Sequence, residues 1–366
     1  MAVAEALLGQ AAHTMMAQDA LWISDALLSS SGDGNGSGVP PLVLFGHSSR
    51  IVYEGALAIR SANPVVGLPS LISLLPDQHG AVISRARHAN KLLDDTKKTF
   101  RDLLVEMGAY YALHHKAFSG NAVWFARRFE TDLGLFEAAG RTLGGTIPLQ
   151  FRFGVPPTVS ISDLGPIVHD VAVEQGSVLA LLFKADGTGA TATATIDYTP
   201  IGPVLSKDRK ANRYLDARYD PALAMEAKLL LLMIEGEAST TDVVLPTTER
   251  GHREAVFRAR IVSLFHVLSA IEAILSEYPS AQSDGARRIR QLMDESATRW
   301  FLDDPVVRTL RNRCMHYEIR DKQLALDPNL PMFGMVEAIC SGRSFDQVNT
   351  ESIAVINRVA DALGAW

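Results

Sequence analysis

The amino-acid sequence predicts an α+β N-terminal part, residues 1–245, followed by a mostly helical C-terminal four-helix bundle, residues 246–366. Apolar residues recur with a helical period in parts of the first third of the chain and throughout the last third. Short strand-like runs lie between them, in residues 146–198. At 366 residues, with 47% hydrophobic residues, the chain exceeds one ordinary domain and can bury a sizeable core.

Composition limits the classes of function. The formal net charge is −6, so binding to nucleic acid would need a local basic face. The best candidate is a group of arginines near the C-terminus: Arg287, Arg288, Arg290, Arg299, Arg308, Arg311, Arg313 and Arg320. An alternative is that these arginines form a solvated surface, balanced by nearby carboxylates. Cys314 and Cys340 lack the paired spacing of a disulfide framework or a zinc site, so we expect no metal.

Targeting signals are not evident. The N-terminal residues lack the basic segment of a signal peptide, and no uninterrupted apolar run approaches the length of a membrane span. We therefore expect a cytoplasmic protein without a membrane partner.

The opening thirty residues have helical spacing, and the Ser- and Gly-rich stretch 29–38 is predicted to be a flexible loop. A phosphate-binding glycine loop needs a strand before it and a helix after it. Here a predicted helix comes first and Pro40-Pro41 follows, which favours extended chain. The glycines are therefore not interpreted as a phosphate site.

Residues 42–45, followed by Gly46-His47-Ser48-Ser49-Arg50, are predicted to be a short strand that turns into a helix. This arrangement is similar to the nucleophile elbow of serine hydrolases, in which a serine lies between two glycines. Arg50 replaces the second glycine, and too little chain precedes it to supply the strands that build an oxyanion hole. Ser48 is thus either the nucleophile of a serine hydrolase or an ordinary loop serine or helix cap.

Helices are predicted over residues 86–118 and 121–138, as an antiparallel pair. The adjacent histidines His114 and His115 diverge on such a helix, so we expect one core and one surface residue rather than metal ligands. Strands are predicted over residues 146–153, 177–184 and 190–198, with a hairpin turn at 186–189 between the last two.

The last third of the chain is predicted to be helical. A buried helix is expected from Asp220-Pro221 to Gly236, then a connection over residues 238–246. Four helices follow: one that ends near 278, one over 283–300, one that begins at Asp304 and one over 351–363. The second is expected to bury Ile289, Leu292, Met293, Ser296 and Trp300, and the last to bury Ile353, Ile356, Val359 and Leu363.

The third of these four helices carries most of the chemistry. Asp304 can cap it, and Pro305 suits its first position. At about 100° per residue, one stripe of this helix is apolar, formed by Val307, Leu310, Cys314 and Tyr317. The opposite face stacks Arg308, Asn312 and His316, and Arg311 flanks it. Guanidinium, amide and imidazole groups are suited to handling phosphate and protons.

The segment Arg311-Asn312-Arg313-Cys314-Met315-His316 resembles the motif of the HEPN superfamily, whose nucleases carry an Arg, four to six residues and then a His. The resemblance covers about the last third of the chain. It implies a HEPN-like bundle that cleaves RNA without a metal or cofactor, by attack of the ribose 2′-hydroxyl on the adjacent phosphate, leaving a 2′,3′-cyclic phosphate.

The bare spacing is weak evidence, because about two matches are expected by chance in a chain of this composition. A second match, Arg260 to His266, lies in the apolar helix that ends near 278, and His266 is expected to be a packed or edge residue. The Asn after Arg311 and the arginine-rich face favour the match at Arg311.

The resemblance implies a role for each residue of the motif. His316 would move protons near neutral pH, Arg311 would hold the phosphate and Asn312 would orient the imidazole. The arginines predicted to bind RNA are Arg308, Arg313, Arg287, Arg288 and Arg290. On an ideal helix Arg311 and His316 lie about 140° and roughly 7.5 Å apart, so a bend or a second subunit must bring two such groups together. The resemblance implies a homodimer through the C-terminal bundle.

Three functions remain open from the sequence. The first is a HEPN-type endoribonuclease of a toxin or antiviral defence system, in which the N-terminal part senses a trigger, restrains the nuclease or binds an antitoxin or another regulatory partner. The second is a non-catalytic HEPN-like bundle that binds RNA or protein. The third is a serine hydrolase that uses Ser48.

Overall fold

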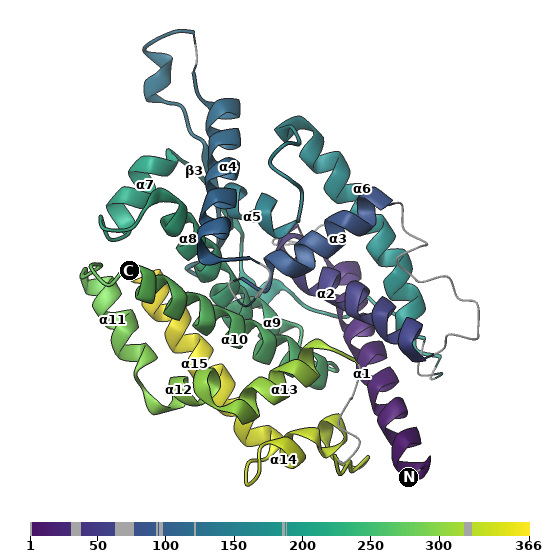
Figure 1. The fold of residues 1–366 in the computed structure, drawn as a ribbon. Coiled ribbons are helices and arrows are strands. Elements are labelled where there is room, and N and C mark those ends of the chain that lie inside the picture. Colours follow the sequence, from purple (N-terminus) through teal and green to yellow (C-terminus); the bar gives the residue numbers. More distant parts are fainter. Residues whose placement is uncertain are drawn as a thin grey trace.

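A computed structural model describes residues 2–30, 38–62, 77–92, 94, 98–120, 122–184, 187, 189–317 and 324–366 (Figure 1). These residues are mostly helical and contain a small antiparallel sheet of three strands. All strands lie in the N-terminal part, and the described residues from 246 onward contain helices alone. Strands beside helices in the first part and a helical second part are thus confirmed.

The chain begins with α1 (Ala2–Ser29) and α2 (Val39–Ala62), as Figure 1 shows. The opening helix is confirmed, and most of the predicted glycine-rich loop lies outside the described residues. The strand predicted over 42–45 is wrong, because these residues lie in the first turns of α2. Val43, Leu44 and Phe45 are all buried, and a continuous apolar run fits a buried helix as well as a strand.

The next helices are α3 (Asp77–Ala89) and α4 (Phe100–Phe118), so the single helix predicted over 86–118 is wrong. Helix α4 has its own start, at which Thr99 and Asp102 form a capping box. The helix predicted over 121–138 is also wrong. A 3-10 turn, Ala126–Arg128, is followed there by the strand β1 (Leu133–Ala138).

The sheet has the strand order β2-β1-β3. Strand β1 pairs with β2 (Arg141–Gly145) and with β3 (Leu205–Arg209), and in this register Leu135 faces both Gly145 and Lys207. Two predicted strands are wrong, because residues 146–153 form α5 (Thr146–Arg152) and residues 177–184 end α6 (Ile161–Leu182). Residues 190–198 lie in no strand, and the turn predicted at 186–189 is partly outside the described residues.

Helix α8 (Met225–Ser239) lies at the centre of the molecule and follows α7 (Ala211–Arg218). It continues through a π-helical turn (Thr240–Val244) into α9 (Leu245–Thr247), so the connection predicted over 238–246 is wrong. Helix α8 packs against β2, α4, α10 and α15. One hydrophobic core therefore continues from residues of the first part to residues of the second, and the division into two domains stays a prediction.

After α9, the described residues contain a 3-10 turn (Pro331–Gly334) and six α-helices: α10 (Arg253–Glu277), α11 (Asp284–Met293), α12 (Ser296–Asp303), α13 (Pro305–Met315), α14 (Met335–Ile339) and α15 (Phe345–Gly364). The helix predicted over 283–300 is broken at 294–295. Its buried stripe is confirmed except at Ser296, which is exposed, and Trp300, which is half-buried. In α15 the prediction is wrong only for Ile353, which is exposed.

Helix α10 is the one helix in the described part of the chain that is long and apolar enough to cross a membrane. However, 78% of its most apolar window is buried inside the protein, so α10 packs as a core helix. Helix α13 packs on α10, and α2 packs on α1 and α3. Charged side chains of α1, α2, α3, α10 and the end of α13 contact one another where these helices pack together.

Candidate active site

The site is built at the end of α13. Asp304 caps this helix by accepting a hydrogen bond from the Val306 amide at 2.9 Å, and Pro305 takes the first position. The apolar stripe is confirmed, since Val307, Leu310, Cys314 and Tyr317 are all buried. The prediction that His316 lies on a helical face is wrong, because α13 ends at Met315. His316 is the C-cap residue, with an extended backbone (φ −117°, ψ 138°), and its side chain leaves the Arg308 and Asn312 face.

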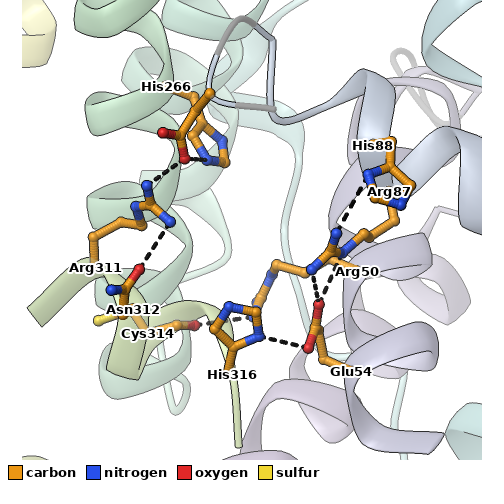
Figure 2. Close-up of polar contacts among 10 residues, drawn as sticks. Arg50, Glu54, Arg87, His88, His266, Arg311, Asn312, Cys314 and His316 are labelled. Carbon is orange, nitrogen blue, oxygen red and sulfur yellow. Dashed lines mark hydrogen bonds and ion pairs between the residues drawn. The ribbon is translucent and has the colours of Figure 1, made fainter. Parts of the chain in front are cut away.

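His316 is paired with a buried carboxylate from α2. Its Nδ1 lies 2.7 Å from Oε2 of Glu54, while its side chain remains 39% exposed (Figure 2). Glu54 is also paired with Arg87 of α3, whose Nε donates to Oε1 at 2.8 Å. Burial raises the pKa of the Glu54 carboxyl, but His316 and Arg87 outweigh that effect, so its pKa lies below the ordinary value.

The second nitrogen of this imidazole, Nε2, has no hydrogen-bond partner among the described residues. An imidazole that is oriented through Nδ1 by a carboxylate, with Nε2 left without a protein hydrogen bond, can accept and return a proton. The group that orients His316 in the structure is therefore Glu54. The Asn312 side chain, predicted for that role, instead accepts a hydrogen bond from Arg311 at 2.9 Å.

Arg311 points away from His316, as Figure 2 shows. Its guanidinium is ion-paired with Asp94 and lies 4.4 Å from the centre of the Phe265 ring. His266 of α10 approaches the same oxygen of this carboxylate, with its Nε2 3.7 Å from Asp94 Oδ2. Burial raises the pKa of Asp94, but His266 and Arg311 together bring it below the ordinary value. Arg311 is thus buried, and its two terminal nitrogens are bonded to Asn312 and Asp94.

A second buried cluster fixes the end of α13. Arg50 of α2 donates to the carbonyl oxygen of Cys314 and to Asp19 of α1, each at 3.0 Å. Asp19 also accepts from Arg258 at 2.8 Å and from the Tyr317 hydroxyl at 2.7 Å. The residues on both sides of His316 are therefore held by N-terminal helices.

The predicted RNA-binding arginines are not gathered in one place. Arg308 is exposed on α13, and Arg313 is half-buried there. The other three lie on α11, which Figure 1 places beside the C-terminus, away from the junction of α13 with α1 and α2. Their partners are local: Arg287 pairs with Asp284, Arg288 donates to Ala365, and Arg290 donates to Tyr278 and Ala281.

The second segment with Arg-to-His spacing, Arg260 to His266, is packed in the core as expected. Arg260 is buried and donates to Asn349 at 2.5 Å. His266 is also buried, and this burial lowers its pKa. Its position beside Asp94 was not expected from the sequence, because nothing in the α10 pattern points to the segment before α4.

The cavity beside the buried charged residues is too small for a substrate. A cavity of about 20 Å³ lies between α2, α3, α8 and α10, lined in part by His47, Arg50, Glu237 and His266. This volume holds about one water molecule. A substrate would therefore approach His316 from the surface rather than through this cavity.

Ser48 has a different environment from the one predicted for a nucleophile. It lies within α2 rather than on a turn after a strand, and it is buried. Its hydroxyl donates to the Gln175 side-chain oxygen at 2.7 Å, so it contacts an amide rather than a base.

In the described ranges, no three His, Cys, Asp or Glu side chains are placed to hold a metal ion. Both cysteines are buried, and burial raises the pKa of Cys314 to about 12 and of Cys340 to about 11.

The residues that sequence reasoning missed are Arg50, Glu54, Arg87 and Asp94. Glu54 lies 262 positions before His316, and Asp94 lies 217 positions before Arg311. The sequence nevertheless contained a sign of a buried ionic site. Arg50 and Glu54 are opposite charges one helical turn apart in a largely apolar segment. No protein-family model, curated protein or solved structure matches this chain.

Proposed function

We propose that this protein is a metal-independent endoribonuclease of the HEPN type, with His316 as the residue that transfers protons. The observation that carries the proposal is the pair of Glu54 and His316, whose Oε2 and Nδ1 atoms lie 2.7 Å apart while the His316 side chain stays 39% exposed. A buried carboxylate in this position fixes the ring and stabilises the charged form that arises during proton transfer.

The proposed reaction needs only the RNA and protein side chains. His316 Nε2 takes the proton of a ribose 2′-hydroxyl, and that oxygen attacks the adjacent phosphorus. The bond from phosphorus to the 5′-oxygen breaks, and the leaving oxygen receives a proton from an imidazolium. The products are a 2′,3′-cyclic phosphate and a 5′-hydroxyl end.

A cation must stabilise the charge that develops on the phosphate. Arg308 is the exposed guanidinium of α13, whereas Arg311 would become available only if its ion pair with Asp94 opened. A homodimer through the C-terminal bundle would bring a second His316 and a second set of arginines to one RNA strand. This arrangement would supply a general base and a general acid together.

We place this nuclease in the cytoplasm, as a toxin or antiviral defence effector that a partner regulates. Support comes from the origin of Glu54 and Asp94, which both belong to the N-terminal part and contact the two motif residues. An antitoxin or trigger that moved these segments would change the state of His316 and Arg311 together.

A second candidate function is a HEPN-like bundle that binds RNA or protein without cleaving. The engagement of Arg311 by Asp94, Asn312 and the Phe265 ring favours it, because these contacts also suit a purely structural arginine. The hydrolase based on Ser48 has no such support, since its hydroxyl is buried against Gln175.

The decisive experiment is cleavage of labelled single-stranded RNA in the presence of a metal chelator. We expect the wild-type protein to produce ends with 2′,3′-cyclic phosphate, and His316→Ala to lower the rate by about 10² to 10⁴-fold. His169→Ala is the matched control, because His169 is an exposed histidine of α6 whose neighbour is Asp170, and it should cleave normally. Arg311→Ala is expected to abolish cleavage while the dimer persists in size-exclusion chromatography.

Two outcomes would contradict the proposal. If pure His316→Ala protein cleaves as fast as wild type, His316 transfers no proton in the reaction. If the wild-type protein retains labelled RNA on a filter but never cuts it, the non-catalytic bundle is the better description.

A further inference from the structure

The segment between α4 and β1 exposes three large aromatic side chains. Trp124 is 80% exposed, Phe125 60% and Phe129 79%, within a span of six residues. In Figure 1 this segment projects beyond the end of α4, away from the core. A group of exposed aromatic rings on a protein surface usually indicates a binding site.

The same segment borders a basic hollow. A cavity of about 360 Å³ opens there, and its lining includes Arg128, Phe129, Arg209, Lys210, Arg213 and Tyr214. These four cations face two carboxylates, Glu130 and Asp208, so the hollow is basic although the whole chain carries a net charge of −6. None of the four cations is ion-paired within the described part of the chain.

Hydrogen bonds of Asp132 fix the chain beside this hollow. The Asp132 amide donates to the Arg209 carbonyl at 3.1 Å, and the Asp132 carboxylate accepts from the Ala211 amide at 2.7 Å. Strand β1 is paired with β3 directly beside these contacts. The cations at the end of β3 and the start of α7 are therefore held close to the root of the aromatic segment.

We propose that these aromatic and basic side chains form a binding surface for single-stranded RNA, an inference that rests on the proposed function because the RNA is its substrate. Bases stack on the exposed rings, and phosphates contact Arg128, Arg209, Lys210 and Arg213. Phe129 and Tyr214 lie among the cations in one hollow. This interleaving matches the alternation of bases and phosphates, whereas a membrane-inserting surface separates an apolar tip from a charged rim.

The length of α4 sets the scale of an RNA strand that runs along this side of the molecule. Helix α4 has 19 residues, so it is about 28 Å long. Its first turn follows the segment of Asp94, beside Arg311, and its last turn leads to Trp124. At about 3.4 Å per stacked nucleotide, a strand of roughly eight nucleotides spans the length of this helix, from the side of Arg311 to the aromatic segment.

Binding is measured separately from cleavage, with full-length His316→Ala protein and fluorescent RNA of 4 and 20 nucleotides in an anisotropy titration. We expect the double variant Trp124→Ala, Phe129→Ala to weaken binding of the longer RNA by about 30-fold, and the short RNA to bind weakly throughout. Arg213→Gln should lower the salt dependence of log Kd by about 0.7. Val105→Ala, which removes an exposed apolar side chain of α4, is the control and should leave binding unchanged.

The outcomes separate this inference from the proposed function. Equal RNA affinity in the double variant and its parent overturns the inference. The inference is also overturned if the double variant loses binding to vesicles of phosphatidylcholine and phosphatidylserine but keeps its full affinity for RNA. If the wild-type protein never cleaves RNA but the double variant still loses affinity, the surface is established and the nuclease fails. If cleavage of the 20-nucleotide RNA is identical in wild type and in the double variant made on the wild-type chain, the surface does not hold the substrate.

Discussion

At the scale of single residues, Glu54 has the strongest influence on the candidate site. It is buried, and its two oxygens are divided between His316 and Arg87. A carboxylate in this position is useful only while it is ionised, and the neighbouring cations keep its pKa below the ordinary value although burial acts in the opposite direction.

Replacement of Glu54 by Gln tests this role. The amide keeps the shape and can still accept a hydrogen bond from Nδ1, but it cannot stabilise a charged imidazole. We expect kcat for RNA cleavage to fall by about 10² to 10⁴-fold with little change in KM, measured in steady-state assays. Glu106→Gln, which breaks the surface pair with Lys98, should change neither value. Normal kcat in Glu54→Gln would mean that the carboxylate does not assist the reaction.

Stability in acid should depend on the same residue. The pKa of Glu54 is lowered in the folded protein, so its contribution to the free energy of unfolding is complete above about pH 4.5, its ordinary value, and is lost as the pH falls through the folded-state value. Asp94 and Glu237 act in the same direction. Urea midpoints at pH 7 and pH 4 should therefore differ less for Glu54→Gln than for wild type. An equal or larger difference in the variant would contradict this assignment.

The sequence predicted Arg311 and His316 on one helix but on different sides of it, and the structure gives each a separate carboxylate partner. Helical spacing describes faces of a helix that continues, but α13 ends at Met315 and His316 turns away from it. The partners Glu54 and Asp94 come from distant segments, and no local pattern encodes which distant charges will meet. The chemistry of the motif was predictable from its residues, whereas its geometry required the tertiary structure.

At the scale of elements, the close approach of α8 and β2 organises the centre of the fold. A Cβ atom added at Gly236 of α8 would lie 2.7 Å from the Leu143 carbonyl oxygen in β2. Real Cβ atoms do not approach backbone this closely, so glycine is required here for packing rather than for its backbone angles.

Two glycines in helices provide a matched test of this contact. Gly236→Ala should lower the free energy of unfolding by about 1–3 kcal/mol, because the helix and the strand must move apart. Gly176→Ala in α6 should be neutral or raise it by up to about 1 kcal/mol, since nothing lies within 4 Å of the added methyl and alanine favours helix. Chemical denaturation of both variants measures the difference. Similar values for the two would show that α8 tolerates a side chain at Gly236.

How well a helix or strand could be predicted from the sequence depended on the length of the element and on how much of it is buried. The long helices α1 and α10 were expected at nearly their observed positions, and α15 was expected over 351–363, without its first two turns. Helix α5 has only seven residues, and all from Ile147 to Arg152 are buried, so its apolar run shows no period to separate helix from strand. This explains the wrong strand at 146–153, whereas the wrong strand at 177–184 lies at the end of the long, partly exposed α6.

At the scale of the whole molecule, Asp19 ties the two predicted parts together. It is completely buried and accepts hydrogen bonds from Arg50 of α2, Arg258 of α10 and Tyr317 after α13. Two guanidinium groups and one hydroxyl thus depend on one carboxylate. The sequence suggested a boundary near residue 245, but these contacts and the continuous core cross it.

Because of this arrangement, we expect residues 1–245 and 246–366 to unfold in one transition. Asp19→Ala leaves Arg50 and Arg258 buried without their carboxylate, which should lower the free energy of unfolding by at least about 3–5 kcal/mol. Thermal unfolding followed by circular dichroism and by tryptophan fluorescence should give coincident curves, shifted together to lower temperature in the variant. Asp19→Asn, which keeps the packing volume, should shift them less.

Two separated transitions in the wild-type protein would mean that each part folds independently, and Asp19 would then only join their surfaces. A single shared transition would mean that any partner that loosens the N-terminal helices also loosens Arg50 from Cys314, and with it the position of His316.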